Sequence, residues 1–174
     1  MEREADGTMR IIGIDPGLRI TGWGIVDAEG SRLVHVGHGT VTSDDKAALS
    51  ERLRSLYDGL YEVVARYNPG GAAVEQTFVN ANAASALKLG HARAVALLVP
   101  AQTGLTVAEY EPGVVKKALT GSGRADKAQV AAMVARLLPG IDRTARADAY
   151  DALAVAICHA HHGATRSGWA VQAR

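Results

Sequence analysis

The chain has 174 residues, a hydrophobic share of 48%, a charged share of 21% and a formal net charge of +1. These values are typical of one ordinary globular domain. We expect no membrane span, because no apolar run approaches the roughly 20 residues that a bilayer requires. The single cysteine excludes an internal disulfide and a cysteine-based zinc site, and it favours a cytoplasmic location.

Three antiparallel strands are predicted at the start of the chain. Apolar runs at 10–14 and 20–26 flank the sequence DPG, whose Pro and Gly stand where a type II turn requires them. These two runs therefore predict a hairpin. A third strand is expected over 32–41, where hydrophobic residues alternate with polar or small ones.

Helices and strands then alternate. An amphipathic helix is predicted over 49–67, because its apolar residues recur every three or four positions, and the sequence NPGG ends it. A short strand at 72–76 follows. A second helix starts at 82 and ends near Pro100, and the sequence LTVAEY predicts a fifth strand over 105–110.

The last third of the chain predicts helices only. One helical turn starts at Pro112, and Asp126 is positioned to cap a helix that follows the loop GSGRAD. A final helix is expected from Arg146 to a cap at Gly163. Antiparallel strands followed by alternating helices and strands indicate an α/β fold, with a mixed sheet and helices on both faces.

Four carboxylates stand out on these elements. Asp15 and Glu75 each end a predicted strand, and Asp148 and Asp151 share one face of the last helix. Each has an ordinary alternative as a turn former, an exposed acid or a helix-start charge. Together on packed elements they require compensation, since a buried ionised carboxylate costs several kcal/mol. Mg²⁺ or Mn²⁺ prefers such ligands, and two ions about 4 Å apart flank a phosphodiester, so the pattern favours phosphoryl transfer or hydrolysis.

Four segments resemble the RuvC family of bacterial Holliday junction resolvases in order and spacing, over about Met9 to His162: GIDPGLRITGWGIV, AAVEQTFVNANAASALKLGHARAVAL, YEPGVVKKALTGSGRADKAQVAAMV and ADAYDALAVAICHAH. The resemblance implies a ribonuclease H-like fold with a five-stranded mixed sheet. It also implies a homodimeric, divalent-metal-dependent endonuclease that nicks two opposing strands of a four-way DNA junction, in partnership with branch-migration motor proteins. The corresponding domain division is an extension at 1–8, one nuclease domain at 9–163 and a tail at 164–174.

The same resemblance assigns the catalytic and metal-binding roles to the four carboxylates. Asp15 is expected to bridge two ions of Mg²⁺ or Mn²⁺, and Glu75 and Asp151 to complete separate shells. Asp148 is expected to hold a metal or the attacking water.

Seven further residues are candidate DNA contacts: Phe78, Lys116, Lys127, Arg124, Lys88, Arg93 and Lys117. From the sequence alone, the single phenylalanine is a core residue, whereas the resemblance implies an aromatic side chain that stacks on bases opened at the junction. The resemblance places Lys116 and Lys127 near the cut phosphate. The last three candidates contact DNA or are solvated. Residues 88–174 carry 11 Lys and Arg against 6 Asp and Glu, which permits a phosphate-binding face.

Two other functions account for parts of this sequence. GIDPG and a later TG resemble the phosphate-binding hairpin of actin-like ATPases, but 174 residues leave little room for their second lobe. A junction-binding protein without catalysis would not need four carboxylates. The sequence HAHH is interpreted as the end of a helix rather than a metal site, and Trp23 as a core or dimer contact.

Overall fold

The computed structural model describes residues 7–76, 82–142 and 144–172, with side chains described as far as Gly163. Its strands and helices are, in chain order, β1 (Met9–Asp15), β2 (Ile20–Glu29), β3 (Arg32–Thr42), α1 (Leu49–Tyr67), β4 (Gly71–Glu75), α2 (Ala83–Gln102), β5 (Val107–Tyr110), α3 (Pro112–Thr120), α4 (Lys127–Leu137) and α5 (Ala147–Gln172). Within those ranges, none of the helices combines the length and apolar character needed to cross a bilayer.

The five strands form one mixed sheet, as predicted, and their order in the sheet is β3-β2-β1-β4-β5. β2 pairs antiparallel with both β1 and β3. β4 pairs parallel with β1, and β5 pairs parallel with β4. As a result, β1, β3, β4 and β5 all end at the same edge of the sheet, which we call the carboxyl edge.

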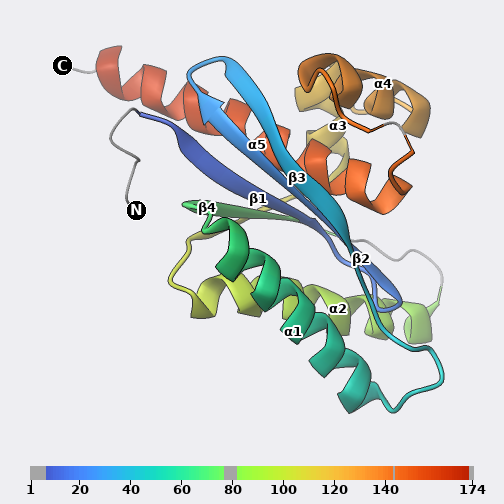
Figure 1. Ribbon diagram of the computed structural model, residues 1–174. Coiled ribbons are helices and arrows are strands. Elements are labelled where there is room, and N and C mark those ends of the chain that lie inside the picture. The colour runs from blue at the N-terminus through green and yellow to red at the C-terminus, as the bar shows by residue number, and fades with distance from the viewer. Residues whose placement is uncertain (1–6, 77–81, 143, 173–174) are drawn as a thin grey trace.

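Helices cover both faces of this sheet, which confirms the predicted layers (Figure 1). α1 and α2 pack on one face around a cluster that includes Ile12, Leu56 and Val99. The other three helices pack on the opposite face around a cluster that includes Ile11, Leu153 and Ile157. The alternation of buried side chains along β1 supplies both clusters, because neighbouring strand residues point to opposite faces.

The main chain of α5 lies in direct contact with the main chain of the β1–β2 hairpin. A Cβ atom on Gly22 would lie 1.9 Å from the carbonyl oxygen of Asp148, and one on Gly13 would lie 2.1 Å from that of Ala152. Neither position therefore has room for a side chain. The start of α5 is held next to Gly22, which pairs with Asp15 across the hairpin.

Several predicted helix ends are confirmed. Asn68 follows α1 with a left-handed φ of 44°, which ends the helix at NPGG. Pro112 is the first residue of α3. Asp126 caps α4 in a capping box with Gln129, so the first residue of α4, Lys127, has a fixed backbone position.

Two local predictions are wrong. The turn after Asp15 is not type II, because Gly17 lacks the positive φ that this turn requires. Gly17 is instead needed for space, since a Cβ atom there would lie 2.2 Å from the carbonyl oxygen of Ile20. Gly163 does not cap the last helix, which continues to Gln172. Gly163 does not adopt the left-handed conformation of a C-cap, and inside a helix a glycine costs only about 1 kcal/mol relative to alanine. α2 ends at Gln102, near Pro100 as predicted.

Candidate active site

The four predicted carboxylates meet at the carboxyl edge of the sheet. Asp15 ends β1, and Glu75 ends the neighbouring parallel strand β4. Asp148 and Asp151 lie in the first turns of α5, which the glycine contact holds against the hairpin. The charges of the other three acids all act on Asp15. Asp15 is therefore the centre of the cluster.

Burial and mutual repulsion make the cluster hard to ionise completely. Burial first, then the charges of Glu75 and Asp151, raise the pKa of Asp15 to about 8. Burial also raises the pKa of Glu75. A hydrogen bond joins these two side chains, which requires a proton between them. One proton held by this pair is therefore favoured over two adjacent negative charges.

Basic side chains partly neutralise the remaining acids. Lys127 Nζ lies 3.4 Å from Asp151 Oδ2, and this contact raises the pKa of Lys127. The charges of Lys127 and Lys116 both act to lower the pKa of Glu75. Both predicted lysines thus face the carboxylates, where they lie beside any phosphate that reaches the acids.

The side chains at this site suit a hard divalent cation. The cluster offers several carboxylate oxygens, and such a cation would remove the repulsion that raises the pKa of Asp15. Among the described residues, no three Asp, Glu, His or Cys side chains are already arranged as a metal-binding group. Three of the four carboxylates are instead engaged with other side chains, through the Asp15–Glu75 hydrogen bond and the Lys127–Asp151 ion pair. The residue types fit Mg²⁺ or Mn²⁺, and binding requires these two contacts to open.

The other candidate DNA contacts have different surroundings. Lys88, Lys117 and Arg124 are exposed. Arg93 is partly buried, and its Nε donates a 2.9 Å hydrogen bond to Glu109 Oε2, so this guanidinium already has a partner inside the protein. Phe78 lies outside the described residues. Its proposed contact with bases stays a prediction.

A hollow of about 630 Å³ adjoins Lys127 and Asp151. One wall is the exposed side of α4, where four alanines, Ala128, Ala131, Ala132 and Ala135, leave room next to Tyr150 of α5. This hollow extends the surface available to a large substrate beyond the carboxylates.

Sequence reasoning gave no role to Arg146. Its Nε lies 3.9 Å from Asp148 Oδ2, and the only sequence signal is its position two residues before that acid. The histidines of HAHH make contacts within the protein: His159 Nδ1 lies 2.8 Å from the Tyr110 hydroxyl, and His162 Nδ1 lies 2.9 Å from the Cys158 carbonyl oxygen. Trp23 packs against the core, with its ring 5.5 Å from that of Tyr67.

Comparison with known proteins gives consistent results. Residues 11–159 match the family model described as crossover junction endodeoxyribonuclease RuvC. Proteins of that name from Gluconacetobacter diazotrophicus and Paramagnetospirillum magneticum are 59% and 60% identical to this chain. The alignments cover 90% and 91% of this chain, and 93% and 95% of those proteins.

Solved structures agree with this match. The structure described as T. thermophilus RuvC in complex with Holliday junction substrate has a TM-score of 0.84 at 31% identity, covering 90% of this chain and 96% of that one. The yeast mitochondrial resolvase Ydc2, at 11% identity and a TM-score of 0.60, shares the fold. The α/β architecture is thus ribonuclease H-like. This chain belongs to the RuvC family of crossover junction endodeoxyribonucleases, in which divalent metal ions are generally used.

Proposed function

We propose that this protein resolves four-way DNA junctions by paired symmetric nicks during recombination and repair. One observation carries the proposal: three further carboxylates, from one strand and one helix, act on Asp15 at one edge of a ribonuclease H-like sheet. The T. thermophilus relative, similar over nine-tenths of this chain, is described with a Holliday junction substrate. A cytoplasmic location is part of this proposal, because DNA is the substrate.

Asp15, Glu75, Asp148 and Asp151 would hold two ions of Mg²⁺ or Mn²⁺. When bound, the ions supply activation of a water molecule and stabilisation of the leaving oxygen. Asp15 has to give up its proton first, because a carboxyl group coordinates a hard cation as the anion. The central position of Asp15 among the other acids suits it to a bridging role.

The lysines act on the DNA rather than on the metal. In the described structure Lys127 is paired with Asp151, and its side chain is 82% exposed, so the ammonium group is free to transfer to a phosphate when the acid takes another ligand. Lys116 is placed to do the same next to Glu75. Lys88, Lys117 and Arg124 extend the basic surface, whereas the Glu109 partner of Arg93 favours a structural role for that residue.

A homodimer is the proposed active form. Two equivalent nicks in a symmetric junction require two equivalent sites, which a two-fold dimer supplies. The exposed side of α2 is a suitable contact surface, because Leu87 and Leu98 are 64% and 49% exposed on that helix. Large apolar side chains gathered on one exposed surface are typical of a protein interface. Branch-migration motor proteins remain proposed partners on the strength of the family.

Cleavage of a labelled synthetic four-way junction in Mg²⁺ tests the proposal. We expect Asp15→Asn, Glu75→Gln, Asp148→Asn and Asp151→Asn each to slow nicking by at least about a thousandfold, equivalent to a loss of about 4 kcal/mol of transition-state stabilisation. Junction affinity, measured in chelator, should stay within about tenfold, because binding depends on Lys and Arg contacts with phosphates.

Glu29→Gln is the matched control, since Glu29 is exposed and ends the antiparallel strand β2 at the opposite edge of the sheet. It should cut like the parent. Continued nicking by the Asp15 variant would refute the assignment of the metal site. Equal cutting of a linear duplex by the parent would refute selectivity for junctions.

A further inference from the structure

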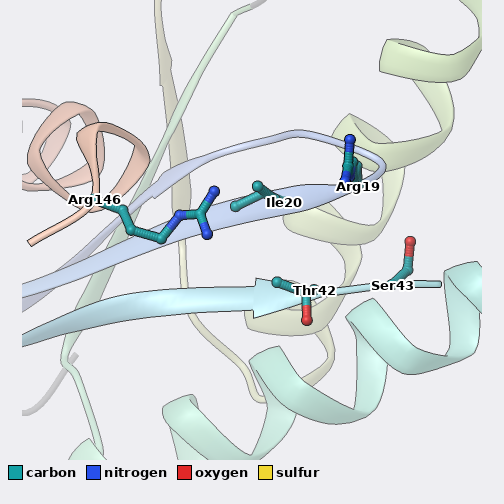
Figure 2. Close-up of a pocket in the computed structure, with 5 residues that line it drawn as sticks. All are labelled: Arg19, Ile20, Thr42, Ser43 and Arg146. Atoms are coloured by element: carbon teal, nitrogen blue, oxygen red, sulfur yellow. The ribbon is translucent and has the colours of Figure 1, made fainter. Parts of the chain in front are cut away.

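A second hollow, of about 410 Å³, opens at the carboxyl edge on the other side of Asp15 from Glu75. It lies where the β1–β2 turn, the end of β3 and the residue before α5 meet (Figure 2). Its lining residues are Arg19, Ile20, Thr42, Ser43 and Arg146. Two of these five side chains are guanidinium groups, and no acid lines the hollow. Its chemistry is therefore that of an anion site.

Both arginines are available to a ligand. Among the described residues, the exposed Arg19 side chain has no hydrogen bond or ion pair. The Arg146 side chain is 62% exposed, and the one ion pair it makes within the described part of the chain is the 3.9 Å contact with Asp148. In Figure 2, the Arg146 side chain extends from the start of α5 toward Ile20. Guanidinium groups bind phosphate oxygens through two parallel hydrogen bonds, which makes arginine well suited to phosphodiesters.

The wall of the hollow is held in place by hydrogen bonds. Ser43 N donates to the Arg19 carbonyl oxygen at 3.0 Å, and Ser43 Oγ donates to the Leu18 carbonyl oxygen at 2.5 Å. Arg52 Nε donates to the same Ser43 hydroxyl at 3.1 Å. These bonds tie the β1–β2 turn to the end of β3 and to α1. A ligand would consequently meet a preformed surface, with little ordering cost beyond the two arginine side chains.

The strand order places this hollow and Lys116 on opposite sides of Asp15. Along the carboxyl edge, the hollow lies beside β2 and β3, Asp15 ends β1, and Glu75 ends β4 with Lys116 acting on it. A DNA strand whose phosphate reaches Asp15 continues in both directions along this edge. On one side it meets Lys116, and on the other it meets the two arginines.

We propose that Arg19 and Arg146 form a subsite for a non-scissile phosphodiester of the bound DNA, on the side of the carboxylates away from Lys116, with Ile20 supplying apolar surface for the sugar. This inference rests on the proposed function, because it takes the substrate to be DNA. The subsite defines the path of the DNA strand across the carboxyl edge. The strand runs from the hollow, over the carboxylates, to Lys116.

Salt-dependent binding of the full-length protein to a fluorescent four-way junction tests the subsite. Binding is measured in chelator, so that any effect of Arg146 on catalysis through Asp148 does not enter. We expect Arg19→Gln and Arg146→Gln each to weaken binding several-fold and to lower the slope of log Kd against log salt concentration by about 1, the value for one lost phosphate contact. Arg32→Gln is the matched control, since this exposed arginine lies at the opposite end of β3. Arg19→Lys and Arg146→Lys should keep the slope and lose part of the affinity.

Phosphate ethylation interference then locates the contact. In the parent, ethylation should block binding at phosphates on both sides of the cut. The Arg19→Gln, Arg146→Gln double variant should lose interference on one side only, and Lys116→Gln on the other. The subsite is refuted if both arginine variants bind with the affinity and slope of Arg32→Gln while Lys116→Gln binds more weakly. Failure of the parent to bind junctions is a different result, which refutes the proposed function and the subsite together.

Discussion

The protonated carboxyl group at the centre of the site makes stability depend on pH. The pKa of Asp15 is about 8 in the folded protein, against an ordinary value of 3.8. Between these two values, the folded protein holds a proton that the unfolded chain has released. The free energy of unfolding therefore falls as pH rises, by up to about 1.4 kcal/mol per pH unit. From pH 4 to pH 7 the loss is on the order of 4 kcal/mol, and it is complete above pH 8.

The variant Asp15→Asn should remove this dependence. An asparagine has nearly the same shape as a protonated Asp15 and its amide can donate a hydrogen bond to Glu75, but it never ionises. In chelator, we expect the variant to match the parent near pH 4 and to exceed its stability by a few kcal/mol at neutral pH. Urea denaturation at a series of pH values measures the difference directly. Glu29→Gln, which changes an exposed acid at the opposite edge of the sheet, should leave the pH profile of the parent unchanged.

Divalent metal should restore the stability that the parent loses as pH rises, and it should do so in the parent but not in Asp15→Asn. A cation that binds only the folded protein adds about 2.7 kcal/mol at 100 times its dissociation constant. Saturating Mg²⁺ or Mn²⁺ should thus stabilise the parent at neutral pH and flatten its pH profile, whereas Asp15→Asn should respond weakly. The reasoning is refuted if, in chelator, the stability of the parent does not fall between pH 5 and pH 8, or if the Asn variant is no more stable than the parent there.

Three other predictions address separate parts of the molecule. Phe78→Ala should slow cutting of intact junctions more than cutting of junctions that already contain unpaired bases, because an inserted ring helps to hold bases apart; equal slowing on both substrates would indicate a role in the core. Leu98→Asp should shift the protein from dimer to monomer in sedimentation velocity, since it puts a charge on the exposed side of α2; an unchanged dimer would exclude that surface as the interface. Gly13→Ala should lower the free energy of unfolding by more than about 3 kcal/mol, because the new methyl group meets the Ala152 carbonyl oxygen; a small change in urea denaturation would show that α5 can move.

Much of this fold follows from local sequence patterns that can be recognised without the structure. The alternation in β3, the periodicity of α1 and the capping box at Asp126 each depend on nearest neighbours along the chain, and each prediction is confirmed. The predicted end of α5 at Gly163 is wrong for a related reason. A glycine is compatible with both a helix interior and a helix end, and its own residue type does not decide between them.

The site was predictable where residues end strands or share a helix face, because topology then brings them together. Asp15, Glu75, Asp148 and Asp151 follow that rule. The partner of Arg93 was not predictable, since Glu109 lies on β5, 16 residues away along the chain. The pairing of Arg19 with Arg146 across one hollow depends on how α5 begins beside the hairpin, which periodicity does not encode.

The contact between α5 and the hairpin has a consequence for how this site tolerates sequence change. Main-chain atoms meet main-chain atoms at Gly13 and Gly22, so the separation between Asp15 and the acids of α5 does not depend on the size or rotamer of any side chain between them. α5 also packs on the sheet through side chains such as Leu153, but these act on the spacing less directly than the main-chain contacts do. The two glycines are therefore the positions at which a substitution most directly changes the geometry of the carboxylates.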